Sequence, residues 1–206
     1  MRIDGTEYAL FRDYDCGKYR NLTFSGKVQY LEARVERILI SPCRAEVKML
    51  GETNRGLILV TVICAGISAA STFFNGRQAY GGEGEKVFVD FVKTYMDPIL
   101  TERRPKGMES WAQWLYKDVS CGLAHGFTIR DGGFEMELKT YVAVKPYGPE
   151  INPGRLLEDL ARGWSKYLAD VRQGGPGSSL GRRFEARFNR IFHDQAGRTA
   201  ALPGPA

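Results

Sequence analysis

The stretch GLILVTVICAGISAASTFFNG, residues 56–76, carries no charged residue. A helix that is apolar all round is typical of the centre of a bundle, because it reserves no face for water. The same stretch is long enough to cross a bilayer. Its second half, however, is rich in Ser, Ala, Thr and Gly, which weakens membrane insertion. The sequence therefore favours a buried central helix over a membrane span.

Helical periodicity surrounds this stretch on both sides. Before it, apolar residues recur at helical spacing over residues 27–39, and Ser41-Pro42 predicts either a kink or the start of a new helix that ends near Gly51. After it, Asn152-Pro153 has the form of a helix cap followed by a first turn. Further helices are expected over residues 86–100, 108–123, 155–173 and 180–193.

The pattern changes to period two over residues 127–144. Asp131-Gly132-Gly133 has turn chemistry, and the apolar residues Phe134, Met136 and Leu138 then alternate with charged ones. This predicts a β-hairpin, with KPYGPEINP after it as a loop. The predicted fold is therefore mainly α, a helical bundle with a small β-hairpin inserted before the C-terminal helices. We expect one domain over residues 1–194 and a flexible tail over residues 195–206.

Composition limits the classes of function. The chain of 206 residues has a net charge of +5, and residues 155–206 hold nine basic against five acidic side chains, so most of the excess lies there. This charge is lower than that of a dedicated nucleic-acid binder. The cysteines have no C-x-x-C spacing, which predicts neither a zinc site nor a disulfide framework, and no metal or cofactor is expected. The opening residues are polar and mixed, without a signal peptide, so a cytoplasmic location is expected.

One helix ends on a residue that can move protons. The string WLYKDVSCGLAHGF, residues 114–127, runs into His125, one of two histidines in the chain. Imidazole titrates near neutrality and can serve as a general acid or base. A histidine in the last turn of a helix, followed by Gly126, is equally typical of a helix end, where the dipole favours its charged form. Both interpretations stay open at this point.

The helix order over residues 27–194 and the string LYKDVSCGLAHGF together resemble the HEPN family of ribonucleases and their non-catalytic relatives. The catalytic signature of that family is an Arg, four to six intervening residues and a His, so the resemblance places His125 as the catalytic histidine. The Arg is absent here. The positions where it would fall hold Ser120, Val119 and Asp118, and Lys117 lies one residue further back. The signature is therefore degenerate, with Lys117, Asp118, Ser120 and His125 as the candidate catalytic residues.

The resemblance implies a metal-independent endoribonuclease of a defence or toxin–antitoxin type, which works as a homodimer. Such cleavage uses the 2′-hydroxyl of RNA as nucleophile and needs a fixed cation to hold the phosphate, normally Arg. Lys117 is the candidate for that role, with Ser120 as its neighbour on the helix. The missing Arg favours a second reading, a non-catalytic helical module that binds a partner protein or RNA. The sequence leaves open whether the protein is an enzyme.

The last predicted helix is basic and amphipathic. Arg183, Arg187 and Arg190 share one face, beside a stripe of apolar residues. Either the stripe docks on the bundle and the arginines are solvated, or the arginines form a phosphate-binding edge for RNA. The apolar face is too small to anchor the helix on a membrane. We therefore expect RNA or a partner protein as binding partner, and no membrane.

Overall fold

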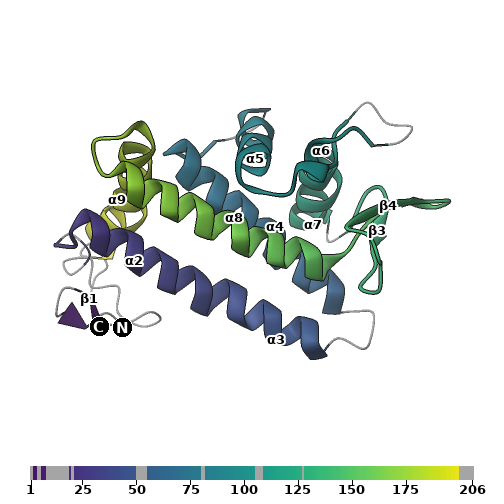
Figure 1. Cartoon of the computed structure of the whole chain (residues 1–206), viewed down its shortest axis with the longest axis horizontal. Helices are drawn as coiled ribbons and strands as arrows, with labels where there is room; N and C mark the ends of the chain where they lie inside the picture. Colours follow the sequence, from purple (N-terminus) through teal and green to yellow (C-terminus); the bar gives the residue numbers. More distant parts are fainter. Residues whose placement is uncertain are drawn as a thin grey trace, which may run out of the picture.

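The computed structural model describes residues 2–3, 6–7, 19, 21–49, 55–79, 82–104, 109–126 and 128–199, with the side chains of residues 2–3, 6–7, 55 and 193–199 excepted. The fold is mainly α with a small β-sheet before the last two helices, as the sequence predicts (Figure 1). The long helices are α2 (Phe24–Val35), α3 (Ser41–Met49), α4 (Arg55–Asn75), α5 (Gly82–Tyr95), α8 (Pro153–Gly174) and α9 (Ser179–Thr199). Two short strands, β1 (Arg2–Ile3) and β2 (Thr6–Glu7), pair antiparallel.

Helix α4 is the central element of the bundle. It contacts α3, α5, α8 and α9, and the buried apolar side chains of the described residues form one cluster around it. Gly66 lets two neighbours come close, because a Cβ at this position would lie 2.6 Å from the Leu39 side chain and 2.9 Å from that of Leu160. Helix α4 is long and apolar enough to cross a membrane, but half of its apolar window is buried inside the structure, as in the core helix of a bundle.

Helices α2 and α3 form one continuous rod (Figure 1), joined by a π turn, η1 (Glu36–Ile40). The Ser41 N–H donates to the carbonyl of Glu36, five residues back. Pro42 has no N–H, and its ring would clash with the preceding turn of a regular α-helix. The wider π turn removes that conflict. Of the two predicted outcomes, the structure shows a helix that begins at Ser41, joined to α2 directly through the π turn.

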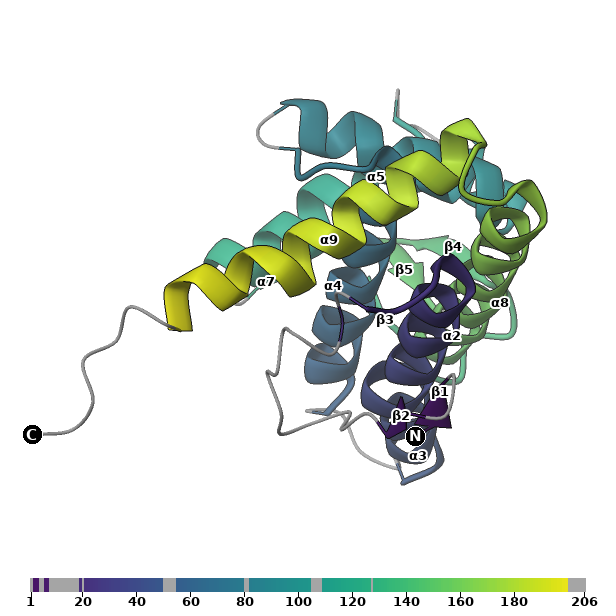
Figure 2. The ribbon, with the colours of Figure 1, turned by 90° about the vertical axis from the view of Figure 1, so that its left-hand side faces the viewer.

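Helix α8 lies beside this rod, and α9 crosses one end of the bundle next to α4 (Figures 1 and 2). The predicted cap of α8 is confirmed, since the Asn152 side chain accepts from the Arg155 N–H at 3.0 Å and Pro153 occupies the first turn. Helix α5 begins at Gly82, before the predicted start at residue 86, and ends before a 3-10 turn, η2 (Pro98–Thr101). Helix α9 continues to Thr199, into the predicted tail.

The helix predicted over residues 108–123 is interrupted by a second π turn. It consists of α6 (Trp111–Trp114), the π turn η3 (Leu115–Ser120) and α7 (Cys121–Gly126). The sequence analysis missed its capping box, in which Ser110 and Gln113 bind each other's backbone N–H. Within the π turn, the Cys121 N–H donates to the Tyr116 carbonyl.

The hairpin lies later in the sequence than the predicted range, residues 127–144. It is formed by β4 (Val142–Lys145), at the end of that range, and β5 (Gly148–Ile151), in the segment expected to be a loop, and β3 (Gly133–Phe134) adds to β5 in parallel. The alternating stretch after Phe134 is not a strand because side chains bind its carbonyls. Asn152 donates to the carbonyls of Met136 and Leu138, and Arg155 donates to that of Lys139.

Two buried tyrosines give a matched test of this packing. The Tyr141 hydroxyl donates to Asp159 Oδ2 at 2.8 Å, whereas the Tyr167 hydroxyl has no hydrogen-bond partner among the described residues and is fully buried. Burial raises the pKa of both hydroxyls, and for Tyr141 the neighbouring Asp159 adds to the effect. Tyr141→Phe should lower the free energy of unfolding by about 2 kcal/mol, because it removes a hydrogen bond to a buried carboxylate. Tyr167→Phe should raise it by up to about 1 kcal/mol, because it removes an unsatisfied buried group.

Urea unfolding of the two variants measures this difference directly. An equal decrease in the free energy of unfolding of both variants would show that the Tyr167 hydroxyl has a hydrogen-bond partner that supports the fold.

Candidate functional site

Lys117 lies in a cluster of charged side chains. Its Nζ is 2.7 Å from Glu109 Oε1 and 3.4 Å from Glu85 Oε1, and its side chain is 39% exposed. The hydrogen bond to Glu109 is the main reason that the pKa of Lys117 is raised, although partial burial opposes it. The positive charge that would have to hold a phosphate is therefore already paired with two carboxylates.

The same cluster extends through Arg104. Its guanidinium lies 3.1 Å from Asp131 and 3.9 Å from Glu109, and stacks over the Trp114 ring with 5.9 Å to the centroid. The Trp114 Nε1–H donates to the Asp131 carbonyl at 2.7 Å. These contacts join α5, the segment before α6, the π turn η3 and the turn before β3. The cluster ties four parts of the fold together.

Asp118 contributes to this cluster through its backbone. The Asp118 carbonyl accepts from the Arg130 N–H at 3.0 Å, and the Gly122 carbonyl accepts from the Thr128 N–H at 3.4 Å. The chain after α7 therefore runs back along its own helix. Burial, then Asp131 and Glu109, raise the pKa of the Asp118 carboxyl, and Arg104 and Arg130 oppose them.

The returning chain also explains the string CGLAH that carries the resemblance. A Cβ at Gly122 would lie 2.4 Å from the Thr128 carbonyl oxygen, so the glycine is needed for the close pass of the returning segment. His125 lies in the last turn of α7 and is exposed. Its position at a helix end agrees with the structural interpretation of this histidine.

The four candidate catalytic residues do not converge. His125 follows Lys117 by eight positions, about 12 Å along a helix, and the recorded interactions of the described residues include none between His125 and Lys117, Asp118 or Ser120. Ser120 is half-buried. Lys117 and Ser120 both lie in the π turn η3, and their proximity on one face of the helix stays a prediction.

Two of the three arginines predicted to bind RNA pack against the bundle. The Arg183 guanidinium stacks on the Phe74 ring at 5.1 Å from its centroid, and Arg187 Nε donates to Thr72 Oγ1 at 3.2 Å. Arg190 is exposed. The arginine face of α9 therefore partly serves to dock the helix on α4 (Figure 2).

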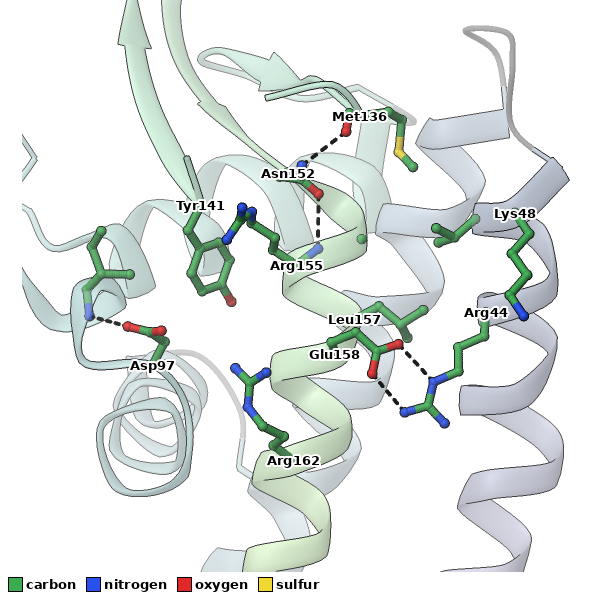
Figure 3. A pocket seen from close by; sticks show the side chains of 13 residues that line it. Arg44, Lys48, Asp97, Met136, Tyr141, Asn152, Arg155, Leu157, Glu158 and Arg162 are labelled. Carbon is green, nitrogen blue, oxygen red and sulfur yellow. Dashed lines mark hydrogen bonds and ion pairs between the residues drawn. The ribbon is translucent and has the colours of Figure 1, made fainter. Parts of the chain in front are cut away.

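A pocket that the sequence analysis did not find lies between α3 and the first half of α8 (Figure 3). Its volume is about 620 Å³, within the range of small-molecule sites. Residues at η2 and in the segment before β4 complete its wall, so four stretches far apart in the sequence meet there. The sequence predicts the cap of α8, but it does not predict that α3 packs beside this cap.

A second hollow, between α3 and the first half of α4, is apolar. Among the described residues, Ile38, Met49, Ile58 and Val62 are exposed, and all four line this groove of about 650 Å³ together with Pro42. Only one charged residue, Glu46, lines it.

The described residues contain no group of three or more His, Cys, Asp or Glu side chains placed to hold a metal ion. Cys43 and Cys64 are buried free thiols, and burial, with a smaller effect of Cys121, raises the pKa of Cys64 to about 12. Comparison with models of protein families, with curated proteins and with solved structures gave no match. The HEPN-like resemblance stays a prediction from the sequence.

The charged cluster around Lys117 predicts a structural role that can be measured. Lys117→Ala should lower the free energy of unfolding by about 1 kcal/mol, since it leaves Glu85 and Glu109 without their shared cation. Lys86→Ala is the matched control, because Lys86 pairs with Asp90 on the exposed surface of α5 and its side chain is 76% exposed. Lys86→Ala should lower the free energy of unfolding by about 0.3 kcal/mol.

Urea unfolding at low and high salt compares the two lysines. Salt should reduce the difference between them. Identical small losses would mean that the cluster does not stabilise the fold.

Proposed function

We propose that this chain is a non-catalytic helical interaction module that forms a homodimer through the apolar groove between α3 and α4. The observation that carries the first half of this proposal is the pairing of Lys117 with Glu109 and Glu85. A cation engaged by two carboxylates gives little stabilisation to a developing phosphate charge. With the signature Arg absent and His125 about two turns away, the helix end lacks the two converging groups that RNA cleavage needs.

The apolar groove supports the second half. Its exposed side chains continue along one face of α4 as Ile58, Thr61, Val62, Ala65 and Ala69. In a two-fold dimer each side chain meets the same surface on the other copy, so a charged face would repel itself. This face is uncharged over the whole of residues 56–76. Its later positions are small, which allows a second helix to approach closely.

The absence of cleavage is the first test. Purified protein incubated with single-stranded RNA and a chelator should leave the RNA intact, and His125→Ala should behave identically. Ser120→Arg, which restores the family's cation, should also be inactive, because the π turn and the acidic neighbours of Lys117 are unchanged. Denaturing gels with analysis of the RNA ends provide the readout. Cyclic phosphate ends that depend on His125 would contradict the proposal and restore the ribonuclease reading.

The groove predicts the oligomeric state. Wild-type protein should sediment as a dimer, and Ile58→Glu should sediment as a monomer, because the charge would be buried without a partner in the interface. Ile58 is 66% exposed in the monomer, so the substitution leaves the core of the monomer intact. Val144→Glu is the matched control, since Val144 is 43% exposed and lies on the hairpin.

Sedimentation velocity over a range of concentrations measures all three proteins. A monomeric wild type at high concentration would contradict the proposal. So would a Val144→Glu variant that dissociates as completely as Ile58→Glu.

A further inference from the structure

The pocket between α3 and α8 has the charge of an anion-binding site. Four basic side chains and two carboxylates line it, and both carboxylates are already engaged. Glu158 accepts two hydrogen bonds of 2.8 Å from Arg44, and Asp97 Oδ1 accepts from the Ile99 N–H at 3.0 Å. The hydrogen bond from Arg44 lowers the pKa of the Glu158 carboxyl. The four basic side chains outnumber the two carboxylates, so the lining keeps a net positive charge.

Two of the basic groups are available to a ligand. Lys48 is exposed, and among the described residues no hydrogen bond or ion pair engages its ammonium group. Arg155 is also exposed, and its one recorded side-chain hydrogen bond, from Nη2 to the Lys139 carbonyl at 2.9 Å, leaves other guanidinium N–H groups for a ligand. The two residues belong to different helices that line the same pocket, and in Figure 3 their side chains extend in different directions, Arg155 beside Tyr141 and Lys48 along α3.

The start of α8 adds to this charge. Asn152 and Gly154 line the pocket, so the first turn of a helix of 22 residues borders it. The helix dipole gives such an end a partial positive charge. Asn152 is 8% exposed, and its side chain is fixed by bonds to Met136, Leu138 and Arg155, which holds this turn in place.

A buried carboxylate fixes the opposite wall. Asp159 is 2% exposed and accepts from the Tyr141 hydroxyl, from the Asp97 N–H at 2.9 Å and from Arg162 Nη2 at 3.1 Å. These bonds set the positions of three pocket-lining residues before any ligand binds. A site that is ordered in advance loses less entropy on binding.

The rest of the lining is apolar. Val47, Ile99, Met136 and Leu157 contribute side chains between the charged groups. A ligand that uses the whole pocket therefore needs an anionic group and an apolar or aromatic body.

We propose that this pocket binds a small organic anion, with the exposed side chains of Lys48 and Arg155 turning to its carboxylate or phosphate group beside the start of α8 and the apolar side chains covering its body. This site is independent of the proposed dimer surface, because no residue lines both hollows.

The experiment uses four probes of known chemistry and isothermal titration calorimetry. 1-Naphthoate carries a carboxylate on an aromatic body, AMP carries a phosphate, 1-naphthalenemethanol has the body without the charge, and inorganic phosphate has the charge without the body. 1-Naphthoate or AMP, or both, should bind about tenfold more tightly than 1-naphthalenemethanol and inorganic phosphate. Which of them binds better distinguishes a carboxylate from a phosphate as the preferred group.

Three variants locate the site. Lys48→Gln and Arg155→Gln should each weaken the preferred anion about tenfold, as expected for the loss of one charge-assisted hydrogen bond. Lys145→Gln, an exposed lysine in β4, removes the same charge outside the pocket and should leave the affinity unchanged. Lys48→Gln and Lys145→Gln should melt at the wild-type temperature, because the replaced side chains are exposed, whereas Arg155→Gln also loses its bond to the Lys139 carbonyl and should melt slightly lower.

Several results would overturn the proposal. These are no binding of either organic anion, equal binding of the neutral alcohol, or an equal loss of affinity in Lys145→Gln. Repeating the titration on monomeric Ile58→Glu separates this proposal from that of the dimer, since the pocket should bind the anion in either oligomeric state.

Discussion

Helix α4 has no polar face, and the rest of the fold follows from the need to cover it. An apolar helix left in water would expose many large side chains, so other elements have to pack around most of its surface. The chain returns to α4 with α5, with the π turn η3, with α8 and with α9. The covering is incomplete along one face of α4, where Ile58 and Val62 remain exposed beside α3 and Ala65 and Ala69 are exposed further along the helix. The apolar groove is thus the uncovered part of the same central helix.

Both π turns occur where a regular α-helix would conflict with a neighbouring requirement. In the rod of α2 and α3, the conflict is the missing N–H and the ring of Pro42. In η3, the Asp118 carbonyl binds the Arg130 N–H of the returning chain instead of continuing the helix pattern. The second π turn changes which side chains share a face, and it does so at the residues from which a catalytic cluster was inferred.

Elements determined by nearby residues could be predicted from the sequence, whereas those determined by distant contacts could not. The apolar run of α4 and the Asn152-Pro153 cap of α8 depend on residues within a few positions, and both are confirmed. The hairpin was displaced because Asn152 and Arg155 bind carbonyls that lie 14 and 16 residues away, which no alternation pattern records. The pairing of Lys117 with carboxylates was likewise not predicted, since Glu85 comes from α5 and reaches the lysine only in the folded bundle.

The number of basic residues on a helix is therefore a poor guide to where an anion can bind in this protein. Arg183 and Arg187 are used to dock α9, and Lys117 is used to join α5 to η3, so their charges are largely engaged by the protein itself. The sequence does not indicate Lys48 and Arg155 as binding residues, because neither belongs to a cluster of basic residues. What brings them to one pocket is the pair of hydrogen bonds between Arg44 and Glu158, which links α3 to α8. Because that link exists without a ligand, the two helices that carry Lys48 and Arg155 keep their positions in the ligand-free protein.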